Sequence, residues 1–270
     1  MMQIISNKYA FLMLVLVSIT ACGGGSSNNN NNGNNNNNGN NNGNNNGNNN
    51  GNGNGNNAVI NTCREVDGLP ISIEALKMKI KNNEDVTQVN TCAITSMSSL
   101  FFDNKTFNQD ISNWNVSAVT NMTHMFWGAK AFNQDIGLWN VSRVRDMSYM
   151  FRDATSFNQD IRYWDVKSVT DMSHMFDGAS AFNQSITYWN VANVKDMSYM
   201  FNRATSFNQS LGGWVVAHVE EMPHMFAYSA FNQFIADWDT SKVVNAMSFR
   251  EGGKLENRHM PSFNPGVDFN

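Results

Sequence analysis

Residues 107–114 read Phe-Asn-Gln-Asp-Ile-Ser-Asn-Trp, and close copies of this phrase return every 25 residues. Later copies begin at Phe132, Phe157, Phe182, Phe207 and, one residue early, Phe231. A period of about 20 to 50 residues is typical of a stacked array, in which each unit buries its apolar face against its neighbours. We therefore expect one rung per copy and a repeat solenoid over residues 97–249.

Two patterns within each repeat predict two halves of a rung. Phe107, Ile111, Trp114 and Val116 are apolar positions in a polar run that favours extended structure. The apolar residues that follow are spaced 3, 3, 1 and 3 apart, as on one helix face: Val119, Met122, Met125, Phe126 and Ala129. The expected fold class is an α/β repeat solenoid that stacks short parallel strands and short helices, with Thr120 or Asn121 as the helix cap.

Several polar positions recur in register and predict columns of stacked side chains. Asn108-Gln109 and its copies should form ladders that satisfy the backbone and each other. His124, His174 and His224 share one position in alternate rungs, with Tyr149 and Tyr199 between them. Histidines two rungs apart would be separated by about 9–10 Å, which is too far for two ligands of one zinc ion. The series therefore predicts a His/Tyr stack, and we expect no metal site and no cofactor.

Acidic residues form two further columns. One contains Asp110, Asp135 and Asp160, and the other contains Asp146, Asp171, Asp196 and Glu221. Carboxylates stacked at about 4.8 Å repel one another, and calcium, which takes several oxygen ligands, is one way to relieve this. Capping of the second half of each rung is the alternative that we favour for the second column.

Binding residues are expected where the repeat leaves its positions free. Two residues between the Ile and Trp columns vary from rung to rung, for example Ser112-Asn113, Arg162-Tyr163 and Gly212-Gly213. If Ile and Trp point inward, at least one residue of each pair points outward. Aromatic residues and Arg are the usual anchors of interfaces. We therefore predict a binding surface, here named the outer strip, that contains Leu138, Arg162, Tyr163 and Tyr188.

The first residues have the pattern of an export signal. Lys8 precedes the apolar run 11–17, which is too short for a bilayer that needs about 20 apolar residues. Residues 19–22, Ile-Thr-Ala-Cys, resemble the lipobox of bacterial lipoproteins, and this resemblance implies cleavage after residue 21 and acylation of Cys22. Gly23 after the cysteine resembles an outer-membrane address. Residues 22–57 then form a lipidated, Asn/Gly-rich tether whose composition predicts disorder.

Residues 58–96 are expected to cap the array. Ser72, Glu74, Lys79 and Lys81 carry the signals of a helix over residues 72–81. With Cys22 used for lipidation, Cys63 and Cys92 form an even pair in an oxidising compartment, and we expect a disulfide between them. Residues 250–270 are expected to be a degenerate final rung or tail.

The repeat resembles a known family. The order Phe-x3-Ile-x2-Trp-x-Val, followed by Val-x2-Met-x2-Met-Phe-x2-Ala, is similar to the repeat of BspA-like bacterial surface proteins over roughly residues 89–250. That family is similar to leucine-rich repeats, and the resemblance implies a curved, leucine-rich-repeat-like solenoid. It also implies a surface role in adhesion or protein binding.

Composition narrows the function further. The net charge of −4 and the pI of about 5.7 come without a basic stripe, which disfavours nucleic-acid binding. We find no nucleophile elbow, reactive-cysteine context or phosphate loop, and we do not expect an enzyme. The sequence favours a lipid-anchored binding or adhesion module at the outer membrane or cell surface, with a protein or glycan partner. The alternative is a structural envelope or spacer lipoprotein without a specific ligand.

Overall fold

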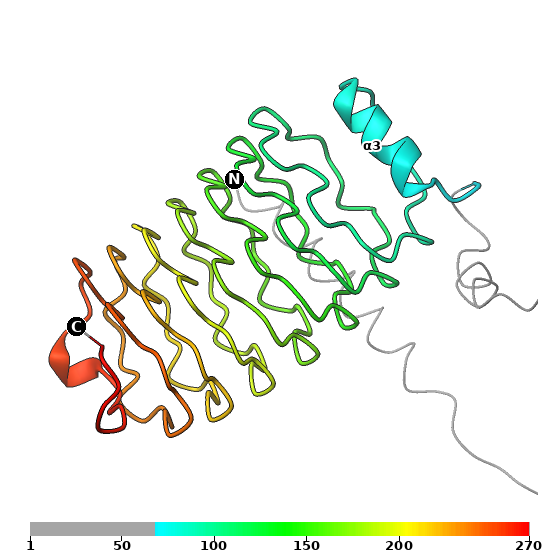
Figure 1. Cartoon of the computed structure of the whole chain (residues 1–270). Helices are drawn as coiled ribbons and strands as arrows, with labels where there is room; N and C mark the ends of the chain where they lie inside the picture. Colours follow the sequence, from blue (N-terminus) through cyan, green and yellow to red (C-terminus); the bar gives the residue numbers. More distant parts are fainter. Residues whose placement is uncertain (1–67, 270) are drawn as a thin grey trace, which may run out of the picture. The chain divides into compact units, whose positions relative to one another are not determined.

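The computed structural model describes residues 68–269 of the 270-residue chain, and these lie in one compact unit. Within it the chain runs as a stack of similar coils, from α3 at one end to the C-terminal residues at the other (Figure 1). The predicted signal 1–21, Cys22, the predicted tether up to residue 57 and Cys63 lie outside the described residues.

Helix α3 covers Ile73–Lys81 and confirms the helix expected from the sequence. The Ser72 side chain accepts a hydrogen bond from the Ala75 N–H at 3.1 Å, which satisfies one free donor of the first turn. Leu76 and Ile80 are buried and join the core of the stack. The helix therefore supplies an apolar face at the N-terminal end of the described stack.

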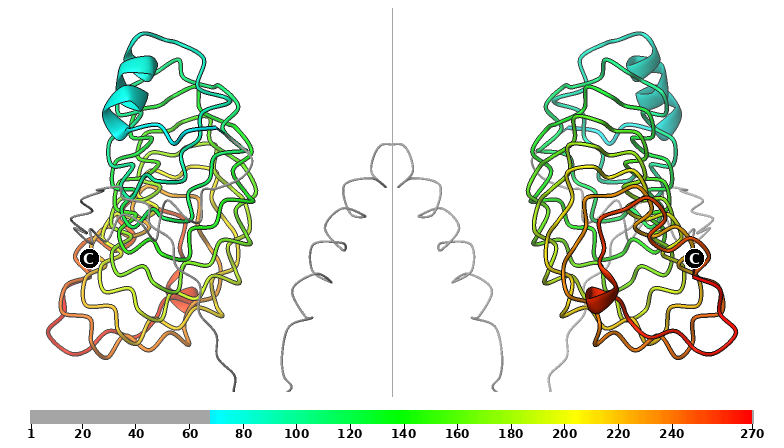
Figure 2. Two further views of the ribbon diagram at one scale, coloured as in Figure 1. Left: turned by 90° about the vertical axis from the view of Figure 1, so that its right-hand side faces the viewer. Right: turned by 90° about the vertical axis from the view of Figure 1, so that its left-hand side faces the viewer.

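Backbone hydrogen bonds join each rung to the next. Isolated parallel bridges link equivalent residues of successive rungs, at Ser96, Asn121, Asp146, Asp171, Asp196, Glu221 and Asn245. From this point four alternate N–H groups donate to the following rung: Met122 to Asp146 O, His124 to Ser148 O, Phe126 to Met150 O and Gly128 to Arg152 O, at 2.8–3.0 Å. We call residues 107–119 and their equivalents the extended half of a rung, and residues 120–131 and their equivalents the turn half. Viewed along the stack, the rungs overlie one another (Figure 2).

The turn half differs from the helical turns expected from the sequence. Within residues 68–269 the helices are α3 and the 3-10 helix η1, Asn257–His259, and no named strand is present. The turn half instead contains successive reverse turns, such as Met125 N–H to Met122 O and Trp127 N–H to His124 O, both 3.2 Å. His124 and Gly128 have φ of 58° and 72°, in the left-handed region that interrupts an α-helix. The three-residue spacing of the apolar positions thus comes from successive reverse turns. Backbone N–H groups of these turns donate hydrogen bonds to the next rung.

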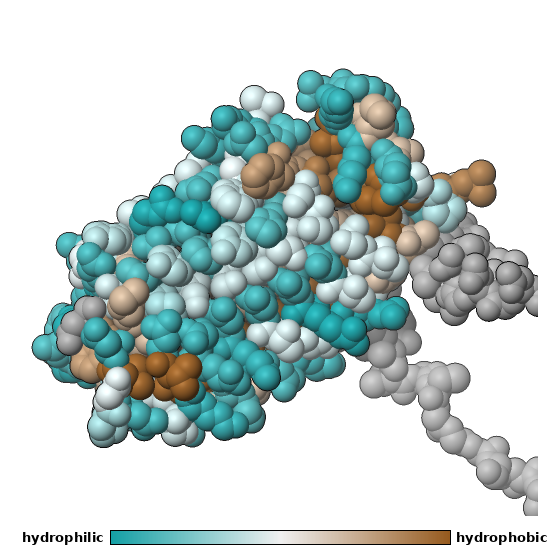
Figure 3. Space-filling view, viewed as in Figure 1, coloured by the Kyte–Doolittle hydropathy of each residue, from teal (hydrophilic) through white to brown (hydrophobic). Residues whose placement is uncertain are grey.

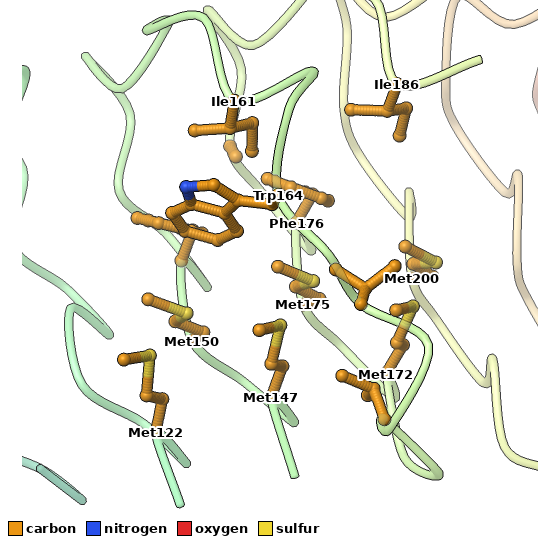
Figure 4. Close-up of a cluster of buried hydrophobic side chains, with 14 of the residues drawn as sticks. Met122, Met147, Met150, Ile161, Trp164, Met172, Met175, Phe176, Ile186 and Met200 are labelled. Atoms are coloured by element: carbon orange, nitrogen blue, oxygen red, sulfur yellow. The ribbon is translucent and has the colours of Figure 1, made fainter. Parts of the chain in front are cut away.

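The apolar positions of the repeat form columns of identical side chains. Figure 4 shows one row of Met122, Met147 and Met172 and another of Met150, Met175 and Met200, below Trp164 and Ile161. All of these side chains are buried. The rings of Phe151, Phe176 and Phe201 stack with centroids 5.7 Å apart. The hydrophobic core is therefore continuous along the stack rather than confined to one rung.

Polar side chains of the phrase bond from rung to rung. The Trp164 Nε1–H donates to the Ile136 carbonyl of the preceding rung at 3.0 Å, and the other repeat tryptophans bond in the same way. The Asn133 Oδ1 accepts the Asn158 N–H at 2.9 Å, and the Gln159 amide donates to Asn133. The expected Asn/Gln ladder is confirmed, and it satisfies backbone donors that would otherwise be unpaired.

The last described residues continue the contacts of the stack. Glu256 N–H donates to the Asn232 side chain at 3.0 Å, and Ile235 N–H donates to the His259 carbonyl at 3.0 Å. The Phe263 ring meets Phe249 edge to face, with centroids 5.3 Å apart. Residues 254–263 therefore lie against the final rung.

Candidate binding surfaces

The outer strip reaches solvent. Leu138, Tyr163 and Tyr188 are 79%, 71% and 86% exposed, whereas the flanking Ile and Trp residues of the same rungs are buried. Arg162 is also exposed. The predicted outward direction of these four side chains is confirmed. Their contact with a ligand remains a prediction, because the structure contains no partner.

The charges close to the outer strip are paired locally. Arg162 Nε lies 2.9 Å from the Asp160 carboxylate, and Lys167 Nζ lies 2.8 Å from Asp165. Both pairs are exposed, and pairs of this kind contribute between about 0 and 1 kcal/mol. The strip therefore offers aromatic and aliphatic area between paired charges, without a concentration of one sign.

The His/Tyr column is confirmed as a continuous stack. Its ring centroids, from His124 through Tyr149, His174 and Tyr199 to His224, are 4.4–4.6 Å apart. Each of these five residues has a φ between 52° and 58°. Burial lowers the pKa of His124, because it disfavours the charged imidazolium. Among residues 68–269 no group of three or more His, Cys, Asp or Glu side chains could hold a metal ion.

Sequence reasoning missed a charged cluster centred on Asp177. This side chain is 2% exposed, and its neighbours come from three successive rungs. His174 Nδ1 lies 3.0 Å from Asp177 Oδ2, while Asn202 Nδ2 and Arg203 Nη2 each donate to Oδ1 at 2.8 Å. Burial raises the pKa of Asp177, but the hydrogen bonds of His174 and Arg203 and the charges of Arg203 and Arg152 outweigh it. The pKa lies below its usual value, so the carboxylate is ionised at neutral pH.

A second missed feature lies beside this cluster. The Arg152 guanidinium lies over the Trp127 ring, 4.5 Å from its centroid, and its Nε is 3.3 Å from Asp177 Oδ2. Phe102 meets Trp127 edge to face at 5.1 Å and is 51% exposed. The signal was present in the sequence, because Phe102, Trp127, Arg152 and Asp177 are spaced by 25 and share the position after the Met-Phe or Leu-Phe pair.

The comparisons with known proteins give one family. The family described as "Mycoplasma protein of unknown function, DUF285" matches twice, over residues 72–169 and 159–263, and together these matches cover more than half of the chain. The chain belongs to the DUF285 family. The double match identifies this DUF285 protein as a repeat protein, in agreement with the stacked rungs. No curated protein and no solved structure matches the chain.

The acidic columns of this DUF285 chain have partners within their own rungs. Asp146, Asp171 and Asp196 each accept the N–H of the Ser two residues later at 2.8–2.9 Å. These carboxylates therefore cap the first turn of the turn half. Burial raises the pKa of Asp171, and the charges of Asp146 and Asp196 act in the same direction. In the other column, hydrogen bonds from Ser112 lower the pKa of Asp110.

Two further findings concern the chain's cross-link and its relation to membranes. Cys92 is buried and disulfide-bonded. Since Cys63 lies outside the described residues, the pairing of the two remains a prediction. In the part of the chain that the structure describes, no helix has the length and apolar character needed to cross a bilayer.

Proposed function

We propose that this DUF285 protein is a lipid-anchored binding or adhesion module displayed at the outer membrane or cell surface. In this proposal acylated Cys22 holds the chain on the membrane and the Asn/Gly-rich tether separates the repeat unit from it. The repeat unit is a leucine-rich-repeat-like solenoid of the BspA-like kind. Mass spectrometry of the mature N-terminus tests acylation directly, and an unmodified Cys22 in the purified membrane fraction would contradict the anchor.

The outer strip carries the binding part of the proposal. Tyr163 and Tyr188 lie in adjacent rungs, with Leu138 one rung before them, and all three are mostly exposed between buried Ile and Trp columns. Residues that packing leaves free, and that are nevertheless large and apolar, are typical of interfaces. A surface protein or a glycan is the proposed partner.

A triple substitution separates binding from stability. We expect R162A/Y163A/Y188A in the full chain to reduce retention on envelope and host-surface fractions at least tenfold, because the main exposed contact area is lost. The melting temperature should be unchanged, since none of the three side chains is in the core. R145A/T170A/K195A, which removes three exposed side chains of another column, is the matched control and should retain binding.

Equal retention of the wild type and the strip variant would contradict this function. That outcome favours the alternative, a structural envelope or spacer lipoprotein without a specific ligand. Retention lost equally by the control variant would also contradict a role for the strip.

A further inference from the structure

One column of the turn half varies in a way that packing does not require. It follows the Met-Phe pair, or Leu-Phe in the first rung, and contains Phe102, Trp127, Arg152, Asp177, Asn202 and Ala227. The Met and Phe columns that precede it repeat the same residue types because every rung needs them. The side chains of this column instead change from aromatic to cationic to anionic along the stack, so each of them gives its own rung a different chemical property. It is separate from the outer strip, which lies in the extended half.

Arg152 of this column is restricted by contacts on several sides. Its guanidinium stacks on Trp127 at 4.5 Å and lies 5.6 Å from the Tyr149 ring centroid. Its Nε is buried and makes no hydrogen bond, but it lies at ion-pair distances from Asp177 Oδ2 (3.3 Å) and Asp153 Oδ2 (3.7 Å). One face and one edge of the guanidinium are thus held before any ligand arrives.

The opposite edge of the same guanidinium is open. Within residues 68–269, neither Nη1 nor Nη2 of Arg152 makes a hydrogen bond, and the Arg152 side chain is 27% exposed. A planar guanidinium with two parallel donors matches the two oxygens of a carboxylate, and fixing the side chain in advance lowers the entropy lost on binding. The geometry is therefore that of a prepared anion receptor rather than of a flexible surface arginine.

The surroundings indicate what the carboxylate should be attached to. Phe102 is 51% exposed and contacts Trp127, so apolar area adjoins the cation. Lys130 is exposed three residues after Trp127, whereas Asp103 is already paired with Lys105 at 3.5 Å. Trp, Arg and Phe gathered beside an exposed lysine are typical of the anchor residues of protein interfaces.

We propose that Phe102, Trp127 and Arg152 form a recognition site for an acidic segment of a partner protein. A Glu or Asp carboxylate of the segment accepts two hydrogen bonds from Arg152 Nη1 and Nη2. A neighbouring apolar side chain of the segment packs on Phe102 and Trp127. Asp177 acts as a positioning residue, because its carboxylate attracts the Nε edge through the 3.3 Å ion pair and so turns the Nη edge away from itself.

The test uses the full chain and two fluorescein-labelled peptides, Gly-Phe-Glu-Phe-Gly and its counterpart with Gln in place of Glu. We expect fluorescence anisotropy to show at least tenfold tighter binding of the Glu peptide, weakening as salt is added. R152A should abolish this preference, and R152K should reduce it, because Lys keeps the charge but loses the paired donors. R145A, which removes another exposed arginine, and the outer-strip triple variant should both bind like the wild type.

Equal affinity for the Glu and Gln peptides would overturn the proposal, as would unchanged binding by folded R152A. Lack of saturable binding by the wild type at millimolar peptide would also overturn it. A parallel titration with oligogalacturonate, an acidic sugar, tests whether the carboxylate comes from a glycan. Binding of this sugar by a protein that does not bind the Glu peptide would overturn a protein partner. If R152A has a lower melting temperature, the R152K result decides.

Discussion

At the scale of single residues, this chain is most informative where its repeat fails. The Phe, Ile, Trp and Met columns explain how one rung packs on the next, but they are the same in every rung. Asp177 occupies a position that holds Trp127 and Arg152 in the two preceding rungs, and there it gathers polar and charged partners from three rungs. A buried carboxylate costs free energy unless it is fully paired, so this residue depends on its neighbours more than any column residue does.

Replacing Asp177 should therefore be far more costly than replacing an exposed aspartate. Asp177→Ala removes the buried carboxylate shared by Arg152 and Arg203, whose own side chains are 27% and 47% exposed, and we expect a loss of about 1–3 kcal/mol in the free energy of unfolding. The matched control is Asp165→Ala, whose exposed pair with Lys167 at 2.8 Å should contribute no more than about 1 kcal/mol. Urea unfolding of both variants measures the difference. Similar losses in the two variants would show that the Asp177 cluster adds no more than a surface pair.

At the scale of elements, the sequence predicts what depends on local signals and on register. Ser72 and Glu74 at the start of α3, with Lys79 near its end, act within one helix, so the sequence alone was enough to locate it. The His/Tyr stack follows from a fixed period, because equivalent residues of a stack must be neighbours. The turn half was misjudged because successive turns and a helix share the spacing of Met122 and Met125.

The remaining errors have the same physical origin. Left-handed backbone at His124 and its equivalents is set by bonds between rungs, and no residue type at that position announces it. The Arg152 site cannot be predicted without knowing that Arg152 stacks on Trp127 and lies against Asp177. The 25-residue spacing of these three residues is nevertheless visible in the sequence. Register could be predicted from the sequence, whereas side-chain direction within the turn half could not.

The column of Asp146, Asp171 and Asp196, whose carboxylates cap the turn halves, leads to a prediction on pH. The pKa of Asp171 is raised above its usual value of 3.8, so the folded protein holds this proton more tightly than the unfolded chain does. Ionisation of Asp171 therefore lowers stability, and this penalty is complete above the raised pKa and vanishes as the pH falls towards 3.8. Asn can accept the Ser173 N–H in the same way, as Asn121 does for Thr123 in an earlier rung.

Asp171→Asn should consequently raise the melting temperature at pH 7. The gain should shrink as the pH is lowered through the raised pKa, and it should vanish once the pH is well below the usual value of 3.8. Thermal unfolding followed by circular dichroism between pH 3 and pH 8 measures it. A lower melting temperature of the Asn variant at pH 7 would mean that the negative charge itself stabilises the turn, and would contradict the assigned effect of burial.

At the scale of the whole repeat unit, stability should be distributed along one dimension. Each rung contacts its neighbours, so the ends of the stack depend on what covers them. Leu76 of α3 is completely buried, at the end where α3 precedes the first described rung with Leu100 and Phe101. Leu76→Ala removes apolar contacts there, at a cost of about 2–5 kcal/mol. In a stack with this geometry that loss should appear as local opening of the N-terminal rungs rather than as uniform weakening.

Hydrogen exchange with mass spectrometry can locate the effect. In Leu76→Ala, amides of residues 86–107 should exchange faster, whereas those of residues 190–230 should keep the rates of the wild type. Met78→Ala, on the exposed side of the same helix, is the control and should change neither region. Faster exchange along the entire stack would show that the rungs unfold as one cooperative unit, and α3 would then stabilise the protein globally rather than cap one end.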